Sequence, residues 1–172
     1  LDFNAVAQGY TADLVGKLLE TNGIYNYLVD VGGEIMARGT KPNGEEWVIG
    51  IERPAENFDS ERSVQIKINL RDKGIVTSGN YRKYIEKDGV RYSHSIDPKS
   101  GYPVPQDLLS ATVIAENATW ADCLASVCML VGKDKAIELL EHEKDVEAYF
   151  IYVEDGKTKT STHRLKTPQL TD

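Results

Sequence analysis

The chain has 172 residues, enough for one domain with a buried core and too few for two independent domains. Its composition, 41% hydrophobic and 27% charged, is typical of a globular protein, and no stretch approaches the roughly 20 apolar residues of a membrane span. The net charge of -7 repels nucleic-acid backbones, so we expect no nucleic-acid partner, and anionic small ligands would need a metal ion or clustered backbone donors.

The first half of the chain predicts one helix followed by several strands. Apolar residues recur at helical spacing over Gly9–Thr21, and Gly23 supplies the usual terminator. The doublet Gly32-Gly33 then separates two β-prone runs, and Val64–Leu70 alternates apolar and polar residues as a half-buried strand does. The strands expected here are Tyr25–Val31, Glu34–Arg38, Trp47–Ile51, Val64–Leu70 and Ile75–Ser78.

The second half of the chain predicts a hairpin, a stiff loop, further helices and a closing hairpin. Residues 87–89 and 155–156 have turn chemistry between β-prone runs, and Gly132 ends a buried helix. The expected elements are strands Tyr81–Ile85 and Val90–Ser93, the loop Asp97–Pro105, strand Ser110–Ala115, helices Thr119–Val131 and Asp134–His142, and strands Val146–Val153 and Lys157–Ser161.

The predicted fold class is α+β. Strands outnumber helices and tight turns join most of them, which favours a mainly antiparallel sheet with helices packed against it. We expect one domain over residues 1–165, followed by a tail over residues 166–172. The chain after His163 is expected to be poorly structured.

The loop from His94 to Pro103 is the first candidate for chemistry. Its prolines and Gly101 make it stiff, and His94 stands three residues before Asp97, which offers a base and an orienting carboxylate. The alternative is a histidine that is only a hydrogen-bonded turn residue, and a lone loop histidine more often has that role. The spacing leaves both open.

The second candidate lies in the helix predicted at Thr119–Val131. Asp122 and Ser126 are one helical turn apart and therefore share a face, among mostly apolar neighbours. A buried carboxylate is costly unless something positive meets it, and a hard cation such as Mg²⁺ would take oxygen ligands from both side chains. The alternative, which the spacing alone favours, is that Asp122 only interacts with the helix dipole near the helix start.

Two further segments have the chemistry to contact a ligand. The segment Asp2–Tyr10 turns into a helix, and helix starts present free N–H groups to a phosphate or ribose. The segment Val76–Tyr81 places small hydroxyl residues beside a glycine. Many strand-to-helix turns and strand ends have the same composition, so a purely structural role is the alternative for both.

Taken in order and at this spacing, these segments resemble the ApbE family of FAD:protein FMN transferases. The family pattern His-x-x-Asp-Pro-x-Thr/Ser-Gly-x-Pro is met in full by His94–Pro103, and Ala-Asp-x-x-x-Thr is similar to Ala121–Ser126. The family segment around Ala-Lys-Gly-Tyr is similar to Asp2–Asp13, its glycine doublet with an acid to Gly32–Glu34, and its Thr-Ser-Gly-x-Tyr to Thr77–Tyr81. The resemblance covers essentially the whole chain, while family members carry a further amino-terminal region that contributes to the flavin site.

The resemblance implies roles for individual residues. Magnesium would be held by the Asp122 carboxylate, the Ser126 hydroxyl and the main-chain oxygen of Ala5, against the FAD pyrophosphate, with His94 as the catalytic residue. The implied cofactor-binding positions are Asp2, Gln8, Glu34, Ser78 and the main chain near Val104. Two positions depart from the family: Gln8 stands where Lys is frequent, and Ser126 keeps only the hydroxyl of the usual Thr.

The function that the resemblance implies is magnesium-dependent transfer of FMN from FAD to a Thr or Ser hydroxyl of an acceptor flavoprotein, with release of AMP. The alternatives are a metal-dependent FAD pyrophosphatase, which uses water as the acceptor, and a non-catalytic FAD-binding protein. The implied acceptors are subunits of membrane redox pumps, and the implied location is the periplasm or cell envelope, with a lipid anchor on the full-length precursor. Whether the protein is a homodimer is left open.

Overall fold

The computed structural model of the chain describes residues 3–53, 63–79, 84–87, 90–105, 107–165 and 169–170. Within these ranges, residues 84–87, 90–95, 104–105 and 169–170 are described by their backbone alone. Asp2, one of the expected cofactor-binding residues, lies outside the described residues. The side chain of His94 is likewise not described, although its backbone is.

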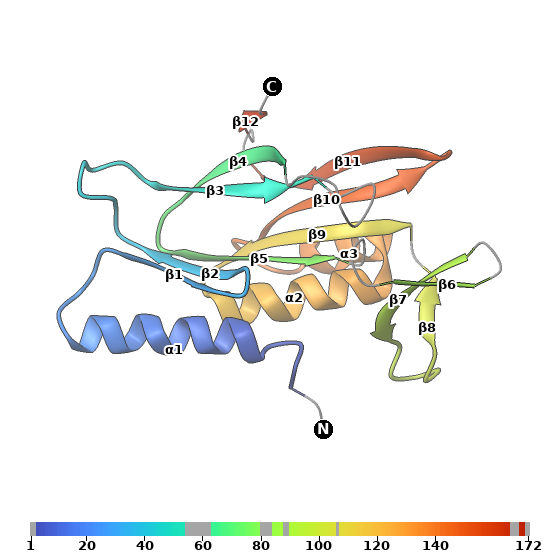
Figure 1. The fold of residues 1–172 in the computed structure, drawn as a ribbon, viewed down its shortest axis with the longest axis horizontal. Coiled ribbons are helices and arrows are strands. Elements are labelled where there is room, and N and C mark those ends of the chain that lie inside the picture. The colour runs from blue at the N-terminus through green and yellow to red at the C-terminus, as the bar shows by residue number, and fades with distance from the viewer. Residues whose placement is uncertain are drawn as a thin grey trace.

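The described elements confirm an α+β fold (Figure 1). The helices are α1 (Ala7–Thr21), α2 (Ala118–Val131) and α3 (Lys133–Glu141). The strands are β1 (Tyr27–Val31), β2 (Glu34–Arg38), β3 (Trp47–Glu52), β4 (Val64–Leu70), β5 (Lys73–Gly79), β6 (Tyr84–Lys87), β7 (Val90–Ile96), β8 (Pro103–Pro105), β9 (Leu108–Ala115), β10 (Glu147–Glu154), β11 (Lys157–His163) and β12 (Gln169–Leu170). In the part of the chain that is described, no helix is long and apolar enough to cross a membrane.

An antiparallel sheet with the order β1-β2-β5-β9-β10-β11 forms the middle layer of the molecule. Because side chains alternate along a strand, neighbouring residues of β5 belong to different cores. Val76 packs with α2 and β10 on one face, whereas Ile75 packs with β4 on the other. The sheet β12-β4-β3 packs on the face opposite the helices, and the sheet β6-β7-β8 lies beside the central layer.

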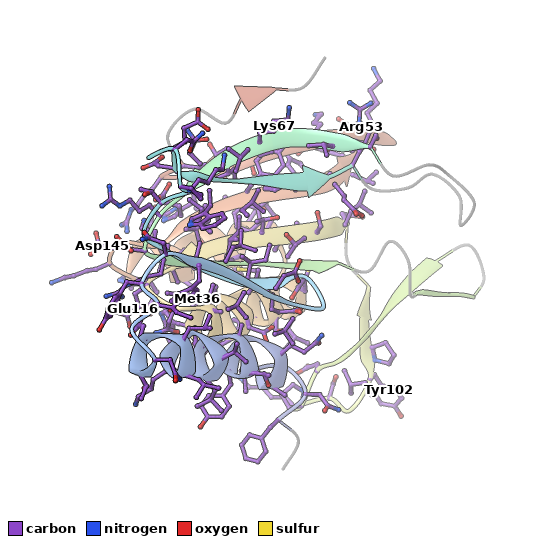
Figure 2. The ribbon with its side chains drawn as sticks, turned by 60° about the vertical axis from the view of Figure 1, so that its left-hand side comes forward. Met36, Arg53, Lys67, Tyr102, Glu116 and Asp145 are labelled. Carbon is purple, nitrogen blue, oxygen red and sulfur yellow. The ribbon has the colours of Figure 1, made fainter. Side chains whose placement is uncertain are left out.

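Helices α1 and α2 cover the same face of the central sheet (Figure 1). Helix α1 lies over β1 and β2, where Ala12 packs with Tyr27 and Met36. Figure 2 shows Met36 between β2 and this helix. The two helices run antiparallel to each other, so the start of α1 lies beside the middle of α2.

Two expectations are wrong, one about the loop at Asp97–Pro105 and one about the chain after His163. The loop expected at Asp97–Pro105 contains strand β8, which pairs with β7 through Ile96↔Pro103 and Tyr92↔Pro105. Proline is tolerated on an edge strand because its missing N–H is not needed there.

Beyond His163, Gln169–Leu170 pairs with the edge of β4, so this part of the expected tail is structured. The division at residue 165 itself stays a prediction.

Candidate metal and flavin site

The three expected metal ligands come together where the start of α1 meets α2. The hydroxyl of Ser126 lies 3.5 Å from the main-chain oxygen of Ala5. One turn earlier on α2, Asp122 Oδ2 accepts a hydrogen bond of 3.0 Å from the backbone N–H of Gly9. The carboxylate and the hydroxyl of α2 therefore line one small region together with a carbonyl oxygen more than 100 residues away in sequence.

Gly9 allows the start of α1 to approach α2 closely. It is the third residue of its helix, so its N–H has no partner within the helix and is free to donate to Asp122. A Cβ atom at this position would lie 2.8 Å from Asp122 Cβ and would also collide with the main-chain oxygen of Ala118. A larger residue at position 9 would therefore push Asp122 away from Ala5 and the chain that precedes α1.

The electrostatics of Asp122 favour a cation nearby. The side chain is 5% exposed, and burial raises its pKa, which the Gly9 N–H bond opposes. Mg²⁺ prefers oxygen ligands, keeps several waters and needs only one or two carboxylates. The donor set of Asp122, Ser126 and Ala5 fits that preference. Among the described residues no group of three or more His, Cys, Asp or Glu side chains is placed to hold a metal.

Glu34 adds a second carboxyl group to this region. Its Oε2 is buried and has no hydrogen-bond partner among the described residues. Burial, together with the nearby charges of Asp122 and Asp30, raises the pKa of Glu34 to about 7. Gln8 belongs to the same group, because a Cβ atom on Gly32 would touch Gln8 Nε2 and would lie 3.5 Å from Glu34 Oε2. The structure thus brings together three of the expected site residues, Gln8, Glu34 and Asp122.

A pH-dependent stability follows from Glu34. The folded protein holds the proton of this acid more tightly than the unfolded chain, so stability falls as the pH rises from about 4.5 to about 7. The variant Glu34→Gln has no such titration and should unfold at a higher temperature than the wild type at pH 8, while matching it at pH 4.5. Thermal unfolding with EDTA present measures both. The exposed Glu138→Gln is the control, and an unchanged pH dependence in Glu34→Gln would contradict the assignment.

Ser78 lies on the same side of the sheet as Asp122. Val76 of β5 packs with α2, and Ser78, two residues further along, therefore faces the helices as well. Thr77 points the other way, where its hydroxyl lies 2.8 Å from that of Thr112 and lines a hollow of about 570 Å³ between β2, β3 and β5. The contact of Ser78 with a cofactor stays a prediction.

His94 and Val104 lie on neighbouring strands beside α2. Strands β7 and β8, which carry them, are paired, and Cα atoms of β7 come within 8 Å of Cα atoms of α2. The turn between the strands is tight: Gly101 N–H donates to Asp97 O at 2.8 Å, and Lys99 N–H donates to Asp97 Oδ1 at 2.9 Å. The Asp97 carboxylate therefore shapes this turn, which projects Tyr102, 73% exposed, from the molecule (Figure 2). That the Asp97 carboxylate also orients His94 stays a prediction.

Sequence reasoning missed the role of Asp13. Its carboxylate accepts hydrogen bonds from the backbone N–H groups of Ala118 at 2.9 Å and Thr119 at 2.8 Å, and from the Thr119 hydroxyl. The sequence marks Asp13 only as the last residue of the segment Asp2–Asp13 that is similar to the family pattern. No local feature indicates that its hydrogen-bond partners lie about a hundred residues away.

Known proteins match the chain over most of its length. The sequence profile of the ApbE family matches residues 1–150. A FAD:protein FMN transferase of Haemophilus influenzae is 37% identical over 96% of this chain and 47% of its own length. Another FAD:protein FMN transferase, from Escherichia coli strain K12, is 41% identical over 93% of this chain and 44% of its own length. The chain thus spans about half the length of the curated relatives that it matches.

Solved structures agree with the sequence comparison. The flavinyl transferase ApbE of Pseudomonas stutzeri, in its apo form, superposes with a TM-score of 0.81 at 38% identity, over 95% of this chain and 49% of its own. The flavin transferase ApbE of Vibrio cholerae gives a TM-score of 0.81 at 34% identity, over 95% of this chain and 50% of its own. Shared sequence, shared fold and the expected order of motifs lead to one conclusion: the chain belongs to the ApbE family.

Proposed function

We propose that this chain takes part in the magnesium-dependent transfer of FMN from FAD to a Thr or Ser hydroxyl of an acceptor flavoprotein, with release of AMP. The observation that carries the proposal is the meeting of Asp122, the Ser126 hydroxyl and the Ala5 main-chain oxygen at the start of α1. The names of the relatives, FAD:protein FMN transferase, support the reaction class.

Different residues of the chain would bind the metal ion and the flavin nucleotide in this phosphoryl transfer. Asp122, Ser126 and Ala5 would hold Mg²⁺, which when bound neutralises charge on the pyrophosphate and aligns it. Gln8, Glu34 and Ser78 would contact the flavin nucleotide from the sides of the site. With its pKa raised to about 7, Glu34 is partly protonated at neutral pH and repels a phosphate less than an ordinary carboxylate would.

His94 would act on the acceptor. In the proposed step the acceptor oxygen bonds to the phosphorus of the FMN half, and the bond from that phosphorus to the bridging oxygen breaks. AMP leaves with the bridging oxygen, and the hydroxyl proton passes to His94. The product is a phosphodiester between FMN and the acceptor, and the bonds balance without an oxidant or reductant.

The family resemblance supports our proposals for the acceptor and the location. We place the acceptor among flavoprotein subunits of membrane redox pumps that present a Thr or Ser. We place the reaction in the periplasm or cell envelope, with a lipid anchor on the full-length precursor.

Incubation with FAD and Mg²⁺, with and without an acceptor protein, tests the proposed function. Transfer predicts a protein band with flavin fluorescence and one AMP for each flavin attached. Free FMN and AMP without an acceptor would indicate the pyrophosphatase alternative. FAD binding with no AMP in either case would support the non-catalytic alternative and contradict the proposal. A chain that binds no FAD would contradict both.

A further inference from the structure

Asp13 connects α1 to the first turn of α2. Its two carboxylate oxygens accept hydrogen bonds from the N–H groups of Ala118 and Thr119, at 2.9 and 2.8 Å, and Oδ2 also accepts from the Thr119 hydroxyl. The first N–H groups of a helix have no partner within it and carry a partial positive charge, so a carboxylate binds well there. Helix α2 also has its own cap, Asn117, whose side chain accepts from Trp120 N–H at 2.8 Å.

The Asp13 contact is one of three that repeat along the two helices. Ala5 meets Ser126, Gly9 meets Asp122, and Asp13 meets Ala118 and Thr119. Each step of four residues forward on the α1 side corresponds to a step of four residues backward on α2. This is the pattern of two antiparallel helices held in a single register.

Two of these three contacts contain the proposed metal ligands, and the third does not. Eight residues separate Asp13 from Ala5, about 12 Å along a helix at 1.5 Å per residue. Asp13 therefore has no direct contact with a cation held by Ala5, Asp122 and Ser126. Its hydrogen bonds join α1 to α2, and any shift of one helix along the other would change the distance from the Ala5 oxygen to the Ser126 hydroxyl.

We infer that Asp13 is a positioning residue, which sets the affinity of the site for a divalent cation by holding α1 and α2 in register. The inference rests on the proposed function, because it assumes that Ala5, Asp122 and Ser126 bind the cation. A main-chain oxygen can serve as a ligand only if its whole segment is held in place, since it has no side chain that can adjust.

The test compares Mn²⁺ binding by the chain with that of Asp13→Ala, Asp13→Asn and a control variant, Asn117→Ala. Electron paramagnetic resonance measures free Mn²⁺ during a titration, and thermal unfolding with EDTA measures stability. The control removes a hydrogen bond to the same first turn of α2, and among the described residues the Asn117 side chain bonds to Trp120 and Glu116, neither of which belongs to α1. It therefore reproduces the loss of stability without the change of register.

We expect Asp13→Ala to weaken Mn²⁺ binding by about 10- to 100-fold, as residues that orient metal ligands do, while Asn117→Ala binds Mn²⁺ like the wild type. Asp13→Asn keeps one acceptor oxygen, so it should fold, and its affinity for Mn²⁺ should lie between those of Asp13→Ala and the wild type. If both Asp13 variants bind Mn²⁺ like the wild type and only unfold at a lower temperature, Asp13 supports the fold alone and the inference is wrong. If the wild type binds no Mn²⁺, the proposed metal site fails, and the inference fails with it.

Discussion

Asp122→Asn will lower the turnover of FAD by at least about 100-fold, the usual cost of removing a group that stabilises charge in a transition state. The amide keeps an oxygen for the Gly9 N–H, so the packing of α1 on α2 is preserved. It lacks the negative charge that would attract a divalent cation. Because burial disfavours that charge in the metal-free protein, the variant should be at least as stable as the wild type with EDTA present.

AMP release at saturating FAD and a Mn²⁺ titration measure this prediction. The matched control is Asp155→Asn, an exposed residue of the β10–β11 turn whose positive φ of 53° suits asparagine. It should leave both readouts unchanged. If Asp122→Asn retained wild-type metal affinity and turnover, the carboxylate would have no part in the reaction.

His94→Ala should reduce FMN transfer by about 10² to 10⁴, the contribution of general acid-base catalysis, and should leave FAD and Mn²⁺ binding intact. Strand β7, which carries His94, passes close to α2, and His94 is not among the proposed metal ligands. The separation of binding from turnover is therefore the informative result. FAD affinity is measured by fluorescence, and transfer is measured by flavin attached to the acceptor.

A control for His94→Ala is His142→Ala, an exposed residue at the end of α3. It should transfer FMN at the wild-type rate. A His94→Ala variant that loses FAD binding and transfer together would show that the residue holds substrate, and its assignment as the base would be wrong.

Local patterns predicted most of the elements. The helical spacing of Gly9–Thr21 and the alternation of Val64–Leu70 correspond to α1 and β4, because the periods of helices and strands are properties of short segments. The same local geometry placed Asp122 and Ser126 on one face of α2. Strands β8 and β12 were missed, because they are short and depend on pairing with β7 and β4.

The arrangement of the site depends on contacts that no local pattern contains. Gly9 and Asp122 are 113 residues apart in sequence, and Asp13 and Ala118 are 105 apart. The approach of Glu34 to Asp122, whose charge adds to burial in raising the pKa of Glu34, likewise appears only once β2 and α2 are packed on the same sheet. The resemblance to the ApbE family predicted the residues of the candidate metal site, and the packing of α1 on α2 explains why these residues lie close together.

Anomalous diffraction from a crystal of this chain soaked in MnCl₂ tests the central claim most directly. The account predicts a manganese peak at bonding distance, about 2 Å, from a carboxylate oxygen of Asp122, the Ser126 hydroxyl and the main-chain oxygen of Ala5. A peak at another place on the molecule, with none between α1 and α2, would contradict it.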